Sequence, residues 1–343
     1  MHHTKSGKID CILGVHVDDV IIAAPEKKIH EVKSMLKTNY IMNDLGELSW
    51  YLGIKFTWSK DKTTCFLSQQ TMIEEVLAEH QLTDCNSRKV PARKEFMRKP
   101  ETEMTEQETK WLSDRDLTQT RYRSVVGALQ YLALATRPDI AFATGQLARF
   151  VACPRRQQWL AAKQILAYLG ATKELSLRFS VKSSKRIMGW VDADWAGNLD
   201  DRSSTSGYVF SLGGGAVSWK SKKQSAPARS SAEAEIMALD LAVREARWLR
   251  KLAKDLQLDT GPTPIYEDNS ATIAISAKHR RTPRTKHIDV QYFAVSDDIK
   301  QGRVEVIPVA SAENVADIFT KGLERVKFEK FREMLGLVKP SIS

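Results

Sequence analysis

Apolar and polar residues alternate along the chain in a way that predicts a β-rich beginning, a helical middle and a mixed α/β end. Two β-rich runs, 11–17 and 20–24, flank Asp18 and Asp19, which predicts a hairpin with both acids at its tip. Aspartate is also a common turn residue, so a purely structural hairpin remains an alternative. Three elements are then expected: a helix over 26–36, an aromatic strand over 50–56 and an amphipathic helix over 67–80.

The middle of the chain is predicted to be helical after a polar stretch. Residues 86–117 combine prolines with mixed charges, and we expect a linker or loosely ordered loop there. Helices are expected over 122–132, 145–150 and 159–169, with an interruption at 137–140. Val126, Leu129 and Leu132 recur at helical spacing and are predicted to be core.

The pattern in the last part of the chain predicts three strands, over 187–192, 206–212 and 216–220, followed by helices that alternate with further strands. Short connections between the first three strands imply an antiparallel meander, with glycines 213–215 in its second turn. The later elements are expected in this order: a helix from Ser230, a strand over 264–267, a helix over 268–275, a strand over 304–309 and a helix over 312–319. Crossover helices demand parallel partners, so the fold class is α+β or α/β with a mixed five-stranded sheet and flanking helices.

Four acids of this region stand at the end of a strand or in the first turns of a helix. They are Asp192, Glu235, Asp268 and Asp317. Such an arrangement is what a metal-dependent phosphodiester-cleaving enzyme needs, because carboxylates crowded together repel one another until hard divalent cations compensate them.

Several residues near these acids leave alternatives open. Ser230 with Glu233 three residues later is typical of a capping box, so Glu233 is assigned to the cap and Glu235 is left to project toward Asp192. Asp268 fits an N-cap as well as a ligand. Asp194 is the alternative to Asp192 as the first of the four acids, since both would share a strand face. We expect Asp194 in the turn that follows the strand.

Composition is ordinary for a globular protein, but the charge is not neutral. The 343 residues carry 52 Lys and Arg against 42 Asp and Glu, a formal charge of +10 that suits a polyanionic partner. The four cysteines lie far apart, which argues against a zinc site or a disulfide framework. No apolar run is long enough to span a bilayer and no signal-peptide core is seen, so we expect a chain without membrane contact, located in the cytoplasm or the nucleus.

Five motifs in order resemble the RNase H domain of copia-type LTR retrotransposon Pol polyproteins. They are 191–197 (VDADWAG), 202–207 (RSSTSG), 230–235 (SSAEAE), 267–271 (EDNSA) and 314–321 (NVADIFTK). Residues 16–23 (HVDDVIIA) resemble the reverse transcriptase hairpin of the same polyproteins, and 122–127 with 135–139 are similar to their thumb-to-RNase H region. The resemblance extends from Ile12 to Leu323.

This resemblance implies a division of the chain into four parts. Residues 1–60 would be a remnant of the polymerase palm with its primer-grip hairpin, 61–185 a mostly helical thumb and connection, 186–325 an RNase H-like domain and 326–343 a C-terminal tail. Asp18 and Asp19 would be the metal residues of the polymerase remnant. Their partner aspartate and the fingers would lie upstream of Met1, so we expect no polymerisation by this chain alone.

For the nuclease part, the resemblance places the acidic tetrad on Asp192, Glu235, Asp268 and Asp317. These four would bind two Mg²⁺ or Mn²⁺ ions and hydrolyse the RNA strand of an RNA/DNA hybrid. Expected partners are the hybrid and upstream Pol domains or a second Pol chain, in a cytoplasmic retroelement particle. A catalytically inactive nucleic-acid-binding remnant is the alternative hypothesis.

A dense basic cluster follows the third acid of the tetrad. Its members are Lys278, Arg280, Arg281, Arg284 and Lys286. Charge runs usually form a solvated surface, but here one sign dominates beside the expected site. We therefore expect contact with the phosphate backbone and binding that weakens with salt.

Overall fold

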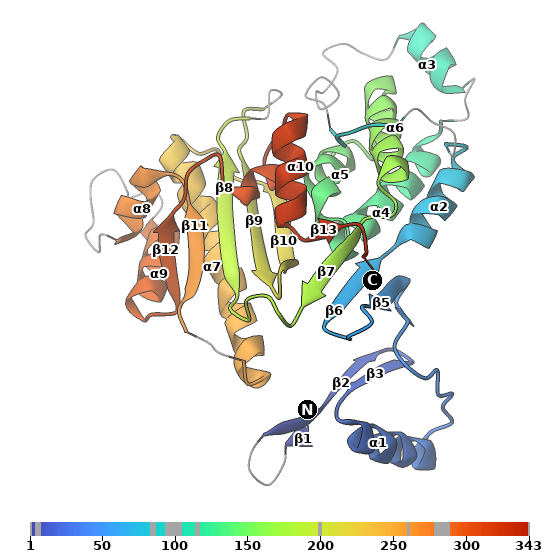
Figure 1. Ribbon diagram of the computed structural model, residues 1–343. Coiled ribbons are helices and arrows are strands. Elements are labelled where there is room, and N and C mark those ends of the chain that lie inside the picture. The colour runs from blue at the N-terminus through green and yellow to red at the C-terminus, as the bar shows by residue number, and fades with distance from the viewer. Residues whose placement is uncertain are drawn as a thin grey trace.

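The computed structural model describes residues 2–3, 8–82, 87–92, 105–113, 117–197, 201–258, 261–277 and 289–341. Three sheets and the helices around them make up this part of the chain (Figure 1). The expected basic cluster at 278–286 lies outside the described residues. Within the described residues, no helix has both the length and the apolar character needed to cross a membrane.

The N-terminal elements form the small sheet at the bottom of Figure 1. They are β1 (His2–His3), β2 (Ile9–His16), β3 (Asp19–Ala23) and helix α1 (Glu26–Asn39). The predicted hairpin is confirmed, because β2 and β3 pair antiparallel, with His16 opposite Asp19. The turn consists of Val17 and Asp18, so only one of the two acids is at the tip, and Asp19 begins β3. Val17 has a positive φ of 53°, as a tight two-residue turn requires.

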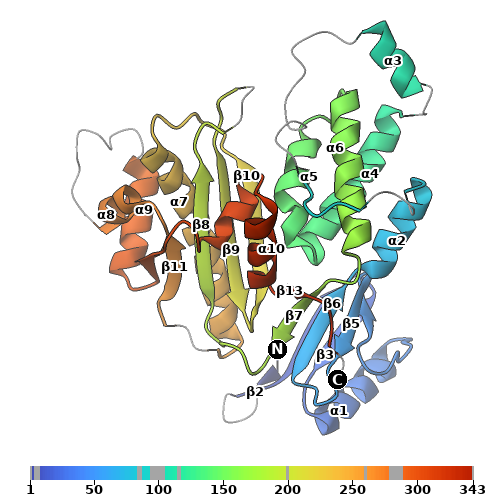
Figure 2. The same ribbon diagram turned by 45° about the horizontal axis from the view of Figure 1, so that its top comes forward.

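A second sheet joins early and late parts of the chain (Figure 2). Its strands, in spatial order, are β13 (Leu337–Val338), β7 (Ser176–Ser180), β6 (Thr64–Ser68), β5 (Ile54–Trp58) and β4 (Trp50–Tyr51). The single strand predicted over 50–56 was wrong: Leu52 and Gly53 have positive φ angles of 49° and 69° and turn the chain between β4 and β5.

Two other predictions fail at this sheet. The helix expected over 67–80 begins only with α2 (Gln70–Glu79), because residues 64–68 form β6 against β7. An apolar run as short as Cys65–Leu67 cannot be assigned to helix or strand by periodicity, and one of its two partner strands, β7, lies more than one hundred residues away. The expected tail instead contains helix α10 (Arg325–Met334) and β13, which pairs with β7.

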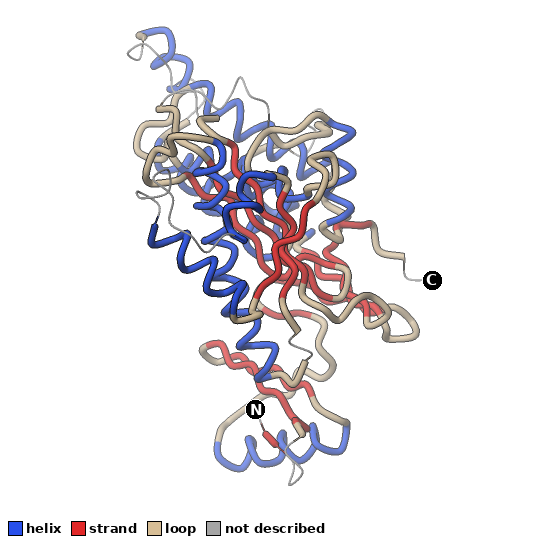
Figure 3. Tube along the Cα trace, turned by 90° about the vertical axis from the view of Figure 1, so that its left-hand side faces the viewer, coloured by secondary structure: helices blue, strands red, loops and turns tan. Residues whose placement is uncertain are grey.

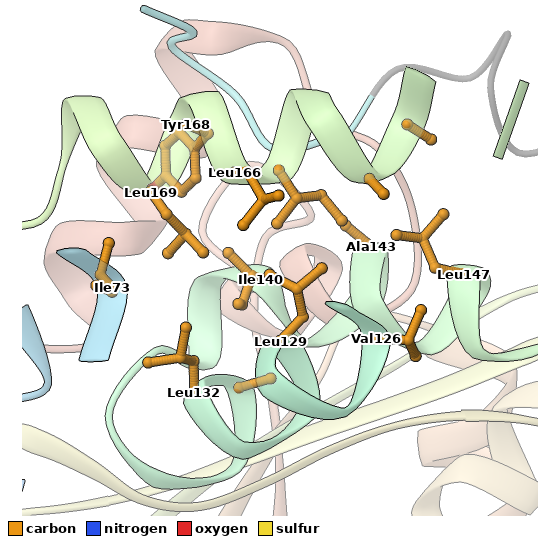
Figure 4. Close-up of a cluster of buried hydrophobic side chains, with 14 of the residues drawn as sticks. Ile73, Val126, Leu129, Leu132, Ile140, Ala143, Leu147, Leu166, Tyr168 and Leu169 are labelled. Atoms are coloured by element: carbon orange, nitrogen blue, oxygen red, sulfur yellow. The ribbon is translucent and has the colours of Figure 1, made fainter. Parts of the chain in front are cut away.

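The middle of the chain packs as a helical unit. Its helices are α3 (Glu106–Ser113), α4 (Gln119–Ala135), the 3₁₀ helix η2 (Pro138–Ile140), α5 (Ala141–Ala148) and α6 (Arg156–Ala171). Figure 4 shows the apolar side chains between them, and Leu129 and Leu132 are fully buried there, with Val126 2% exposed, as predicted. The loop expected over 86–117 was wrong for residues 106–113, which form α3.

The third sheet is mixed and five-stranded, as expected. The elements of this part are β8 (Met188–Asp194), β9 (Thr205–Leu212), β10 (Gly215–Lys223), α7 (Ser231–Asp255), β11 (Thr263–Glu267), α8 (Ser270–Ala277), α9 (Asp289–Lys300), β12 (Val304–Pro308) and the 3₁₀ helix η3 (Val315–Phe319). The spatial order is β10-β9-β8-β11-β12, with an antiparallel meander followed by two parallel strands. Sequence analysis missed α9 and placed a longer helix where η3 is.

Strand alternation distributes the side chains of β8 between two layers. Val191 and Ala193 pack with buried residues of α7 on one face of the sheet. Trp190 packs against a different core cluster, which includes buried residues of η3 and α10, and Figure 1 shows α10 in front of the sheet. Figure 3 shows helices on both sides of the central strands. Asp192, which lies between Val191 and Ala193, is therefore directed toward η3.

A buried ion pair ties the helical unit together. Arg137, 1% exposed, donates from Nε to Asp139 Oδ1 at 3.0 Å and from Nη2 to Oδ2 at 2.8 Å. The Tyr168 hydroxyl donates to the same carboxylate, and Arg137 Nη2 also reaches Thr172 Oγ1 at 2.8 Å. The turn after α4 is thus fixed to α6 by charge-assisted hydrogen bonds that water does not compete for.

Replacing Arg137→Met should lower the free energy of unfolding by about 3–5 kcal/mol, because the buried Asp139 loses its partner. The loss is measured by urea denaturation followed by near-ultraviolet circular dichroism. The double variant Arg137→Met/Asp139→Leu should recover part of it, since no uncompensated charge remains. Lys339→Met, which breaks an exposed pair with Glu174, is the matched control and should leave the midpoint unchanged. A double variant as unstable as the single one would contradict the pairing explanation.

Candidate metal centre

Asp192 lies near the end of β8 and is 3% exposed. The hydroxyl of Thr320 donates a hydrogen bond to Asp192 Oδ2, and Lys321 Nζ lies 3.6 Å from the same oxygen. Burial raises the pKa of Asp192 to about 6, although Lys321 acts in the opposite direction. The carboxylate is therefore held in one orientation by groups that follow η3.

Glu235 reaches the same place from α7. Ser230 caps this helix by accepting from Glu233 N at 3.2 Å, while Glu233 Oε2 accepts from Arg229 N at 2.8 Å. The cap fixes the phase of the helix, so that Glu235 is 6% exposed together with the buried Ile236 and Leu239. The division of roles between the two glutamates follows the prediction, because Glu233 takes part in the cap and Glu235 converges with Asp192.

Asp268 follows β11 directly, where the chain turns into α8. Asn269 Oδ1 accepts from Thr272 N at 3.0 Å and so occupies the capping position of α8. The alternative that Asp268 serves as the N-cap is therefore wrong. Its half-buried carboxyl group remains free for another role.

Carboxylate oxygens of Asp192, Glu235 and Asp268 lie within 4.8 Å of one another. Burial, followed by repulsion from Glu267, Asp192 and Asp268, raises the pKa of Glu235 to about 11. Glu235 Oε2 is buried and has no hydrogen-bond partner among the described residues. Three converging carboxylates with an unsatisfied buried oxygen fit a hard divalent cation such as Mg²⁺ or Mn²⁺, which prefers oxygen ligands.

The structure does not bring Asp317, the fourth predicted acid, into this group of three. Asp317 is 1% exposed in η3, and its Oδ1 lies 2.7 Å from Lys321 Nζ while its Oδ2 pairs with Lys327 of α10. Burial alone would lower the pKa of Lys321, but Asp192 and Asp317 raise it by more. Lys321 thus lies between the group of three and the fourth carboxylate.

The segment 314–321, which contains Asp317, is attached to β8 through several polar side chains. The buried Asn314 donates from Nδ2 to Val191 O at 2.8 Å and caps η3 by accepting from Ala316 N at 3.2 Å. Thr320 binds Asp192 and Lys321 binds both acids, as described above. The motif from which sequence analysis selected only Asp317 therefore carries three further residues, Asn314, Thr320 and Lys321, that contact the end of β8.

Glu267 is a buried acid that sequence analysis did not select. It is fully buried at the end of β11, its Oε1 accepts from Asn269 N at 2.9 Å, and burial raises its pKa well above the ordinary value. Its Oε2 has no hydrogen-bond partner among the described residues. Alternation along β11 was the available signal, since Glu267 shares a strand face with the buried Ile265.

Other candidate acids lie elsewhere. Asp194, expected in a turn, is the last residue of β8 and is not in the group of three. Asp18 and Asp19 are exposed at the β2–β3 hairpin and belong to no group of three potential metal ligands in the described part of the chain.

Residues 1–94 match the family described as reverse transcriptase (RNA-dependent DNA polymerase). The chain is 34% identical over 327 residues to the retrovirus-related Pol polyprotein from transposon TNT 1-94 of Nicotiana tabacum, covering 95% of this chain but 24% of that protein. A putative transposon Ty5-1 protein of Saccharomyces cerevisiae is 33% identical, with 64% of this chain and 68% of that protein covered. The secreted RxLR effector protein 161 of Plasmopara viticola is 49% identical over 128 residues, which are 37% of this chain and 90% of that protein.

Among solved structures, LC11-RNase H1 isolated from compost is similar, with 12% identity and a TM-score of 0.33. The match covers 43% of this chain and 98% of that one.

Gly207→Ala should displace η3 from the sheet. Gly207 pairs with Asp192 across β8 and β9, and a Cβ at this position would lie 2.8 Å from Phe319 Cβ and 3.2 Å from Ala316 O. We expect a loss of about 1–3 kcal/mol in the free energy of unfolding. Hydrogen exchange at the Thr320 amide, which donates to Asp317 O at 3.2 Å, should accelerate.

Gly145→Ala in α5 is the matched control for this substitution. A Cβ there meets nothing within 4 Å, so the change should be neutral or stabilising by up to about 1 kcal/mol. If both variants lost stability equally, crowding at η3 would not be the cause.

Proposed function

The chain belongs to the family of retrovirus-related Pol polyproteins of transposons, and on this basis we propose that residues 186–325 are a ribonuclease H that hydrolyses the RNA strand of RNA/DNA hybrids. One observation carries the proposal: Asp192, Glu235 and Asp268, from three separate elements, converge within 4.8 Å. Almost the whole chain matches the TNT 1-94 polyprotein, but the match covers only about a quarter of that polyprotein. The activity is therefore proposed for this chain and is not transferred from the whole polyprotein.

The chain's own residues would divide the work among them. Asp192, Glu235 and Asp268 would hold cations, Asp317 would contribute from beyond Lys321, and Thr320 would keep Asp192 in a fixed orientation. Two Mg²⁺ or Mn²⁺ ions, when bound, supply the positive charge that activates water and stabilises the leaving 3′ oxygen. No nucleophilic side chain is needed, and the products would be a 5′ phosphate and a 3′ hydroxyl.

Recognition of the hybrid would rest on shape and charge. The 2′-hydroxyl and the minor-groove form distinguish RNA from DNA, so base-reading residues are not required. Lys278, Arg280, Arg281, Arg284 and Lys286 are proposed to contact phosphates. This assignment comes from the charge run in the sequence alone.

For the N-terminal part, we propose that polymerisation requires protein segments beyond these residues. Two-ion polymerase chemistry needs carboxylates from more than one strand, and Asp18 and Asp19 stand together on a single exposed hairpin. Upstream Pol domains or a second Pol chain would supply a carboxylate from another strand.

Incubation with an RNA/DNA hybrid and Mg²⁺ tests the nuclease. The chain should cleave the RNA strand only, and Asp192→Asn should reduce the rate by more than about 100-fold, since even outer-shell partners of a metal are worth about 10–100-fold. Asp297→Asn, which changes a half-exposed acid of α9, is the matched control and should retain the activity. Hybrid binding without cleavage in every variant would favour the inactive nucleic-acid-binding remnant instead.

Neutralising the basic cluster tests the phosphate contact. Arg280→Gln/Arg281→Gln should reduce the slope of log binding constant against log salt by about 2, one for each lost contact. Fluorescence anisotropy with a labelled hybrid measures the slope. Lys182→Gln/Lys339→Gln removes equal charge from two exposed ion pairs and should leave it unchanged. An identical slope in both double variants would reject the contact.

A further inference from the structure

We propose that Lys321 is an internal counterion between Asp192 and Asp317, and that a divalent cation must displace its ammonium group to bind between these two carboxylates. The inference deepens the proposed function, on which it rests, by assigning unequal affinities to the two ions. Lys321 is then a positioning residue that regulates how many ions the pocket holds.

The geometry of Lys321 carries the inference. Its Nζ lies 2.7 Å from Asp317 Oδ1 and 3.6 Å from Asp192 Oδ2, so one ammonium group bridges two carboxylates from separate elements. Asp192 and Asp317 are almost fully buried, and without a cation between them two negative charges would face each other in a medium of low dielectric constant. The ammonium group therefore takes the place that a bridging cation would take.

Lys321 can leave this position without disturbing the backbone. Its side chain is 36% exposed, whereas its backbone N donates to Asp317 O at 3.2 Å and the preceding Thr320 is buried against Asp192. A change of side-chain rotamer would move the ammonium group toward solvent while η3 remains in place. The barrier to opening is then mainly electrostatic.

Lys327 has a different role from Lys321. It extends from α10 to the other oxygen of Asp317, and its Nζ lies 5.2 Å from the centre of the Phe331 ring. No ion pair links Lys327 to Asp192 within the described residues. Asp317 therefore keeps one cationic partner after Lys321 leaves, which favours displacement of Lys321 rather than of Lys327.

Two cation positions of unequal affinity follow from this arrangement. The group of Asp192, Glu235 and Asp268 presents the unpartnered Glu235 Oε2, and Lys321 reaches this group only through its longer contact of 3.6 Å with Asp192. A first ion there can leave the shorter contact of 2.7 Å between Lys321 and Asp317 in place. A second ion between Asp192 and Asp317 must compete with Lys321. The affinity for the second ion should consequently be set by this lysine.

Titration of the metal-free 343-residue chain with Mn²⁺ tests the inference without using activity, and free Mn²⁺ is quantified by electron paramagnetic resonance. The wild type should bind one ion tightly and a second more weakly. Lys321→Gln should lower the dissociation constant of the second ion by at least about tenfold, because the competing charge is gone. Lys321→Arg keeps the charge and should retain weak second binding, and Lys339→Gln is the remote control.

Each outcome decides between the inference and the proposed function. If wild type and Lys321→Gln bind two ions with equal affinities, the counterion role is overturned while the metal centre stands. If neither protein binds Mn²⁺ in the millimolar range, the proposed function falls together with the inference. Circular dichroism of each variant establishes that it is folded, and Lys321→Met replaces Lys321→Gln if the latter is not.

Discussion

Repulsion between buried carboxylates is the constraint on which the rest of this structure depends. Asp192, Glu235, Glu267 and Asp317 are each no more than 6% exposed, and Asp268 lies beside them. Burial and mutual repulsion raise the pKa of Glu235 to about 11, which means that the site resists being fully ionised without cations. The protein supplies two cations of its own: Lys327 pairs with Asp317, and Lys321 lies between Asp317 and Asp192. Glu235, Glu267 and Asp268 form no ion pair with either lysine among the described residues, and they are left to an external cation.

Holding these acids together requires close packing of backbone as well as charge. Gly207 lets η3 approach β9 closely, and Asn314 joins η3 to the backbone of β8. On the other face, the cap at Ser230 sets the rotation of α7 and thereby the direction of Glu235. The site thus depends on contacts between elements more than one hundred residues apart in sequence.

The helical unit and the mixed sheet are also connected to each other. Helix α10 follows η3 and packs Phe328 edge-on against Tyr168 of α6, with ring centres 5.7 Å apart. The same tyrosine donates to Asp139, the partner of the buried Arg137. Strand β13 then pairs with β7, so the C-terminal segment links the sheet that contains the chain's early strands to the part that carries the carboxylates. Displacement of α10 would therefore disturb the pairing of Lys327 with Asp317 and the hydrogen bond from Tyr168 to Asp139.

The sequence by itself determined the features that local physics decides. The hairpin around Asp18, the glycine turn between β9 and β10, and the capped helix that carries Glu235 follow from residues a few positions apart, and all are present. Tertiary structure alone decided which acids meet: Glu267 was brought close enough to raise the pKa of Glu235, while Asp317 paired with lysines from its own segment and from a helix that had been expected as a tail. Strands β6, β7 and β13 were likewise missed or misassigned. Strand pairing and the balance of buried charges are set by neighbours distant along the chain, and periodicity along the sequence carries no information about them.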